Sequence, residues 1–174
     1  MSVISYKILF FDSIKIIAVR QDICRKKTGK KKGNMIMEIE NQKCVMVIDE
    51  ALPAGIAANT AGIMGITLGR HIPETVGPNV TDRNGRTHLG IITVPVPVLK
   101  ASKEKIQEIR EQLYTPEFSD VTVVDFSDVA QSCNVYDEFI KKAADSSEFT
   151  YYGIGIYGRK KAVNKLTGSL PLLR

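Results

Sequence analysis

Short apolar runs alternate with helical patterns from residue 43 to the end of this chain. Lys43–Ile48 is a nearly continuous apolar run, which is typical of a central strand covered on both faces. Val121–Asp125 and Phe149–Ile156 predict further strands. Helices are predicted from about Ala54 to Gly69, between Ser102 and Pro116, after Asn134, and over Arg159–Leu166. This alternation predicts an α/β sandwich with a largely parallel or mixed sheet.

Local signals refine this expectation. Ile91–Val98 is extended, and Pro95 and Pro97 remove two N–H groups from one side, so we expect an edge strand or a poorly paired one. The Asn84-Gly85 pair predicts a tight hairpin. Ser102 is a helix-capping residue before an apolar stripe of Ile106, Ile109 and Leu113. The helix after Asn134 is expected to turn four residues inward, namely Tyr136, Phe139, Ile140 and Ala143.

The N-terminal segment differs from the rest in charge. Residues 1–34 hold nine Lys and Arg against two Asp, so the remainder carries a net charge of −2 although the whole chain carries +5. Asp12 and Lys15 interrupt the apolar run Ile8–Val19, which argues against a signal peptide or membrane span there. We expect residues 1–36 to be a loose basic extension, which either belongs to the native protein or lies outside it, and residues 37–174 to be the domain. A localisation or nucleic-acid-binding arm is the alternative.

Cysteine and histidine usage limits the chemistry. The three Cys lack metal-ligand spacing and there are only two His, so we expect neither a disulfide scaffold nor a metal or other cofactor. Reduced thiols fit a cytoplasmic protein. Ala51–Gly69 contains no charge, but its glycines and polar residues make it too weakly hydrophobic for a membrane span.

Small residues recur at helical spacing in this uncharged segment, namely Gly55, Ala58, Gly62, Gly65 and Gly69. An interior helix glycine costs about 1 kcal/mol relative to alanine, so something is expected to lie close to this face. One interpretation is tight packing on the sheet or on a neighbouring helix. The other is a backbone surface approached by a ligand, or by a second copy in a homodimer.

The last twenty-two residues resemble the C-terminus of type II peptidyl-tRNA hydrolases. They contain Gly153-Ile-Gly-Ile-Tyr-Gly158, a short basic helix and Lys165-Leu-Thr-Gly168. Gly55-Ile-Ala-Ala-Asn59 after the first strand, and Val123-Val-Asp125 followed by Gln131, are similar to two further segments of that family. Residues 43–174 look still more like an uncharacterised branch of the superfamily, known only as a domain of unknown function. The resemblance implies a four-stranded mixed sheet between two layers of helices.

Departures from the hydrolase pattern limit what the resemblance implies. Ile56 stands where the hydrolases have a lysine, the loop before it is shortened, and Gly62-Ile63 stands where they have a histidine. Asp125 matches the family's acidic residue, and Gln131 lies one position late. Loss of a positive group aimed at developing charge weakens catalysis. We therefore place strict peptidyl-tRNA hydrolysis third among the functions, and RNA is an unexpected partner because the domain is not basic.

The residues also suggest a site directly. Asp49 and Asp125 follow strands, where sites in α/β folds gather, and are interpreted either as an acid–base pair or as caps of the following turns. Asn59 is interpreted as bonding a loop carbonyl or as facing a pocket with Asp125. Ser132-Cys133 lacks the context of a nucleophile. The glycine turn before a basic helix is a candidate anion site, so we expect ligand contacts from Gly55, Gly155, Gly158, Lys160, Lys161 and Asn164.

The leading hypothesis combines these residues into one pocket. Asp125, Asn59 and Gln131 are its candidate catalytic residues, and Asp49 joins the ligand-binding set. The pocket would bind a small anionic or nucleotide-like molecule, with hydrolysis of an ester or amide left open. The alternative is a non-catalytic binding or homo-oligomeric assembly module.

Overall fold

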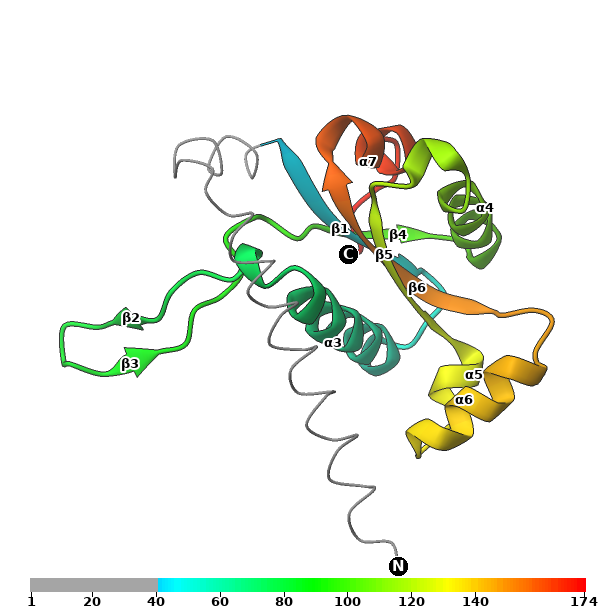
Figure 1. Ribbon diagram of the computed structural model, residues 1–174, viewed down its shortest axis with the longest axis horizontal. Coiled ribbons are helices and arrows are strands. Elements are labelled where there is room, and N and C mark those ends of the chain that lie inside the picture. The colour runs from blue at the N-terminus through cyan, green and yellow to red at the C-terminus, as the bar shows by residue number, and fades with distance from the viewer. Residues whose placement is uncertain (1–40) are drawn as a thin grey trace, which may run out of the picture. The chain divides into compact units, whose positions relative to one another are not determined.

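The computed structural model describes residues 41–174 (Figure 1). Its main strands are β1 (Gln42–Asp49), β4 (Val98–Ala101), β5 (Thr122–Ser127) and β6 (Tyr151–Arg159). Its α-helices are α3 (Ala54–His71), α4 (Lys103–Leu113), α5 (Asp128–Gln131), α6 (Tyr136–Asp145) and α7 (Lys160–Thr167). Single 3-10 turns cover Pro73–Thr75 and Pro116–Phe118. The predicted alternation of strands and helices is confirmed.

The four strands form a mixed sheet in the order β4-β1-β6-β5. β1 pairs in parallel with β4, whereas β6 runs antiparallel to both of its neighbours, β1 and β5. Consequently the C-termini of β1, β4 and β5 lie at one end of the sheet, and the C-terminus of β6 lies at the opposite end. The α/β fold with a four-stranded mixed sheet is confirmed.

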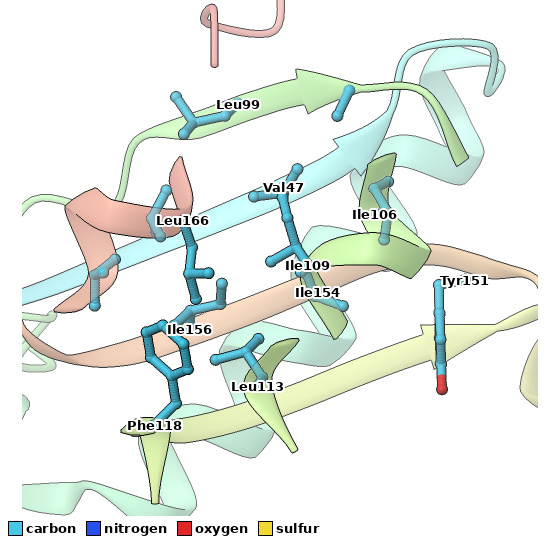
Figure 2. Packing of buried hydrophobic residues seen from close by; sticks show 13 residues of the cluster. Val47, Leu99, Ile106, Ile109, Leu113, Phe118, Tyr151, Ile154, Ile156 and Leu166 are labelled. Atoms are coloured by element: carbon cyan, nitrogen blue, oxygen red, sulfur yellow. The ribbon is translucent and has the colours of Figure 1, made fainter. Parts of the chain in front are cut away.

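Helices cover both faces of this sheet (Figure 1). On one face, Val45 and Val47 of β1 and Ile154 and Ile156 of β6 pack under α4 and α7. Figure 2 shows this cluster, in which Ile106, Ile109 and Leu113 of α4 face the strands. On the other face, Met46 and Ile48 contact α3 through Ala57 and Met64. Successive strand residues point to opposite faces, so a continuous apolar run fills both cores and the sandwich has three layers.

Two local signals have their expected effect. Ser102 caps α4 by accepting a hydrogen bond from the Lys105 N–H at 3.3 Å. Asn84-Gly85 forms the tip of the small hairpin between β2 (Val80–Thr81) and β3 (Thr87–His88). Gly85 has a φ of 78°, and Asp82 accepts from the N–H groups of Asn84 and Arg86. Only residues without a Cβ adopt that φ readily.

The strand predicted over Ile91–Val98 begins later in the structure, as β4. It covers Val98–Ala101 and not Ile91–Val98, and Ile92 makes only an isolated bridge to Val76. Pro97 still contributes, because its carbonyl accepts from the Met46 N–H at 3.0 Å. β4 is an edge strand, as the two prolines indicated, since proline has no N–H for a ladder.

The orientation predicted for the helix after Asn134 is wrong. Tyr136 is 74% exposed and Ile140 is 55% exposed, and no residue of α6 is buried. Figure 1 shows α6 beside α5, at the end of the sheet where β5 finishes. Its apolar stripe therefore has no sheet to cover it, apart from partial burial of Phe139 and Ala143.

Two further predictions concern the N-terminal extension and the crossing of a membrane. The basic extension over residues 1–36 lies outside the described residues, as do positions 37–40 of the predicted domain. Within residues 41–174, no helix combines the length and hydropathy needed to cross a membrane.

Candidate functional site

The predicted site residues lie at two ends of the sheet. Asp49 ends β1, Gly55 and Asn59 lie in the first turns of α3, and Gln131 ends α5. All of these elements meet at the end of the sheet where β1, β4 and β5 finish. In contrast, a second group lies where β6 ends and α7 begins, at the opposite end of the sheet: Gly158, Lys160, Lys161 and Asn164. Because β6 is antiparallel to its neighbours, the structure does not bring the two groups into the single pocket that was expected.

Asn59 and Gln131 do come together. The Asn59 Nδ2 atom donates to the Gln131 Oε1 atom at 3.4 Å, across 72 positions of sequence. This bond joins α3 to α5 at the surface. The loop-carbonyl interpretation of Asn59 is therefore replaced by a side-chain pair.

Asp49 acts as a cap of the turn after β1. Its carboxylate accepts from the Ala51 N–H at 3.0 Å, and the residue is buried. An aspartate that bonds the backbone two residues later stabilises such a turn. This geometry favours the structural interpretation of Asp49 over an acid–base pair.

Asp125 forms an ion pair with Arg110 of α4, on the face of the sheet that α4 covers. It lies inside β5, which is an edge strand, and its Oδ2 accepts from the Arg110 Nε at 2.8 Å. The Arg110 guanidinium also lies 4.0 Å from the centre of the Tyr114 ring. Val124 and Phe126, on either side of Asp125, pack toward α3. The Asp125 carboxylate therefore points to the α4 face and does not share a pocket with Asn59.

The glycine turn predicted before α7 is a strand. Gly153, Gly155 and Gly158 all lie within β6, which leads directly into the helix. A Cβ atom on Gly155 would lie 2.9 Å from Val124 Cγ1 and 3.0 Å from Leu68 Cδ1, and one on Gly158 would lie 3.1 Å from Val121 Cγ2. These glycines are needed for close packing, and the anion-binding turn is not formed.

Positive charge nevertheless gathers at the start of α7. Lys43 Nζ donates to Asn164 Oδ1 at 2.8 Å, and burial together with the neighbouring Lys160 lowers the pKa of Lys43. The Lys160 N–H donates to the carbonyl of Asn41 at 2.8 Å, so this donor is already used.

The glycines of α3 are not needed for close packing on the sheet. A Cβ atom on Gly55, Gly62 or Gly69 would meet nothing within 4 Å, and one on Gly65 would meet only Met46 Cε at 3.5 Å. The tight-packing interpretation of this face is wrong, because the close approach of α3 to the sheet comes from glycines in β6. The ligand and second-copy interpretations stay open.

A cavity of about 440 Å³ lies between α3, β5 and α6. Ile63 and Thr67 line it from α3, Val124–Phe126 from β5, and Tyr136 and Phe139 from α6. The two aromatic rings meet edge to face, with centroids 5.7 Å apart. Asn59 lies one helical turn before Ile63, but neither Asn59 nor Gln131 lines this cavity. Sequence reasoning missed the cavity because it assigned the aromatic residues of α6 to the core.

Cys133 also lines this cavity. Its thiol donates to the Val129 carbonyl at 3.2 Å, and the Ser132 hydroxyl lies 3.8 Å away. Lys142 lies beside it: hydrogen bonding to Glu138, with a smaller contribution from Cys133, raises the pKa of Lys142. His88 pairs with Asp82 in the hairpin at 3.5 Å, so it does not serve Cys133 as a base.

Comparisons with known proteins place the fold but no activity. A family model described as a protein of unknown function (DUF2000) matches residues 42–174. Among solved structures, a protein of unknown function from Agrobacterium tumefaciens strain C58 is similar, with a TM-score of 0.69 and 15% identity over 76% of this chain and 97% of that chain. Likeness at this identity shows the fold alone. No curated protein matches the chain.

Proposed function

This chain belongs to the DUF2000 family of proteins of unknown function. On that premise we propose that it is a divergent member of the type II peptidyl-tRNA hydrolase superfamily. We propose further that it binds a nucleotide-like small molecule. The binding site is the cavity between α3, β5 and α6. The observation that carries the proposal is an aromatic-lined cavity of about 440 Å³ along an open strand edge. Ligand pockets typically measure about 300–1,000 Å³, so a nucleoside fits by size.

The walls of the cavity suit a planar heterocycle. Phe126, Tyr136 and Phe139 present three aromatic rings. A flat base gains about 1–3 kcal/mol by stacking on such a ring. Thr67 and Asn134 add a hydroxyl and an amide to the same lining. A mainly apolar wall with a few polar groups is the usual composition of a small-molecule site.

The open edge of β5 supplies further polar groups. β5 is the last strand of the sheet, so within the described residues no strand pairs with its outer side. The N–H and C=O groups of an edge strand form an alternating row of donors and acceptors. Such a row can bond the donor and acceptor edge of a base. Lys142 lies near Cys133 of this lining, but its ammonium group already pairs with Glu138 at 2.9 Å, so a phosphate would compete with Glu138 for it.

Hydrolysis fits the geometry less well than binding. Asp125 is paired with Arg110, and Asn59 and Gln131 bond each other. None of these three candidates is a free base. Ile56 stands at the position of the hydrolase lysine, so peptidyl-tRNA hydrolysis stays the third hypothesis, and ester or amide hydrolysis stays open. A cytoplasmic location, in which Cys44 and Cys133 remain free thiols, completes the proposal.

Calorimetric titration tests this function. The full-length protein is titrated with adenosine, guanosine and their monophosphates, and with inorganic phosphate alone. We expect saturable binding of at least one nucleoside or nucleotide, which also protects Cys133 from alkylation. Tyr136→Ala should weaken binding, and its high exposure makes a folding defect unexpected. Ile140→Ala on the same helix is the matched control, because Ile140 does not line the cavity. Binding that is absent, or equal in both variants, would contradict the proposal.

Homodimeric assembly is the second candidate function. Ile66 of α3 is 77% exposed, and Val135 and Ile140, which follow β5 and α5 in the chain, are 61% and 55% exposed. Exposed apolar side chains beside an unpaired edge strand favour association of two copies about a twofold axis. Light scattering of the full chain should then give twice the monomer mass, and Ile140→Glu should restore the monomer. A monomeric mass at all concentrations would exclude this function.

A further inference from the structure

A second cavity, of about 390 Å³, lies under the C-terminal half of α3. Cys44 and Met46 of β1 and Tyr157 of β6 line one side of it, and Gly65 and Gly69 of α3 line another. The third wall comes from the two chain segments that lead into and out of the β2–β3 hairpin. This cavity shares no lining residue with the cavity beside α6.

The third wall is a built structure. The Gly77 N–H donates to the Ile91 carbonyl at 2.9 Å, and the Thr93 N–H donates to the Thr75 carbonyl at 2.8 Å. A Cβ atom on Gly90 would overlap the Gly77 carbonyl oxygen, so the two segments touch backbone to backbone. These bonds hold the two segments of the wall together beside α3.

The α3 side of the cavity has unused room. Gly69 would meet no atom within 4 Å if it carried a Cβ, so packing does not require glycine there. Alanine would stabilise the helix by about 1 kcal/mol at such a position. Gly62 is equally free of contacts and lines neither of the two cavities, although it is exposed and Gly69 is half-buried.

The lining of the cavity is uncharged. Within the described residues, no Asp, Glu, Lys or Arg side chain lines it. Burial raises the pKa of the Cys44 thiol to about 11. Burial, with Glu74 and Cys44 nearby, also raises the pKa of Tyr157. Both groups are therefore neutral at pH 7, and the negative charge of Glu74 near Tyr157 disfavours an anionic ligand.

We propose that this cavity is a second binding site, which takes an uncharged and mainly apolar molecule larger than a benzene ring. An apolar cavity of roughly 150 Å³ holds benzene, so the larger volume suits a bicyclic aromatic compound or a branched acyl group. Tyr157 supplies one hydroxyl for a single polar atom of the ligand. The site is independent of the nucleotide proposed for the cavity beside α6.

Fluorescence titration with N-phenyl-1-naphthylamine, an uncharged probe, tests the site on the full-length protein. We expect saturable binding to the wild type. Gly69→Leu should weaken it by about tenfold or more, because the new side chain fills the cavity. Gly62→Leu, the matched control on the same helix, should bind as the wild type does. Gly69→Ala should lie between the two, and it replaces Gly69→Leu if circular dichroism shows that the leucine variant is unfolded.

Three results would overturn the proposal. The first is the absence of saturable binding to the wild type. The second is equal affinity of the Gly69 and Gly62 variants. The third is loss of binding in Tyr136→Ala, which would place the probe in the cavity beside α6.

Discussion

A Cβ atom on Gly153 would lie 2.9 Å from the Cγ2 atom of Thr60. Real Cβ atoms do not come so close to another carbon, so α3 packs directly on the backbone of β6. Thr60 is fully buried and its hydroxyl donates to the Ile56 carbonyl at 2.8 Å, which holds the side chain in place. This contact sets the distance between the helix and the sheet.

Gly153→Ala is therefore expected to destabilise the protein. The added methyl would also lie 3.0 Å from the Val47 carbonyl oxygen, which is backbone and yields little. Overpacking of this kind costs about 1–3 kcal/mol. Urea denaturation followed by circular dichroism measures the loss. The double variant Thr60→Ser/Gly153→Ala should recover part of it, because serine keeps the hydroxyl and removes Cγ2. Recovery of nothing would show that Thr60 is not the obstacle.

Gly62→Ala is expected to have the opposite effect. A Cβ atom there meets nothing within 4 Å, and alanine is favoured over glycine inside a helix by about 1 kcal/mol. The melting temperature should rise in differential scanning calorimetry. A fall would mean that another surface, such as a second copy of the chain, lies against this face of α3.

Asp125→Asn is expected to lower stability through its ion pair. The change leaves the Arg110 guanidinium, whose side chain is only 14% exposed, without its charged partner. Hydrogen bonds to charged groups contribute about 1.5–3 kcal/mol. The matched control is Asp120→Asn, which breaks the exposed pair with Arg159 and should cost less than about 1 kcal/mol. Equal losses in urea denaturation would contradict a special role for the Arg110 pair.

The two described cysteines are expected to differ in reactivity. The thiolate is the reactive form, so a buried thiol with a pKa of about 11 should react on the order of a hundredfold more slowly than an ordinary one. Cys44 is that thiol, whereas Cys133 is partly exposed in the cavity beside α6. Iodoacetamide at pH 8 should modify Cys133 first, as read by peptide mass spectrometry. Equal rates would show that β1 opens readily.

Alkaline pH is expected to destabilise the protein through Tyr151. Burial, followed by nearby Tyr114 and Asp125, raises the pKa of Tyr151 to about 12. An unfolded tyrosine ionises near pH 10, so its contribution is complete below about pH 10 and is lost as the pH rises toward 12. Urea midpoints measured between these limits should fall with pH. Tyr151→Phe should make that fall shallower, and an unchanged slope would exclude this tyrosine as the cause.

Local patterns predicted the elements well but the site poorly. The apolar run of β1, the cap at Ser102 and the turn at Gly85 depend on neighbours within a few residues, so the sequence shows them directly. The partner of Asp125 is fifteen positions away, and that of Asn59 is seventy-two. No local pattern carries such pairings.

The amino-acid sequence by itself determined the alternation of strands and helices, the family and the two-faced strands that fill both cores. Only the tertiary structure decided that the glycines of β6, and not those of α3, carry the close contact, and that the apolar stripe of α6 is left exposed. It also separated Asn59 and Gln131 from Lys160 and Asn164, because β6 is antiparallel to β1 and finishes at the opposite end of the sheet. Local conformation follows from short-range sterics and periodicity, whereas the pairing of distant side chains follows from the order and direction of the strands.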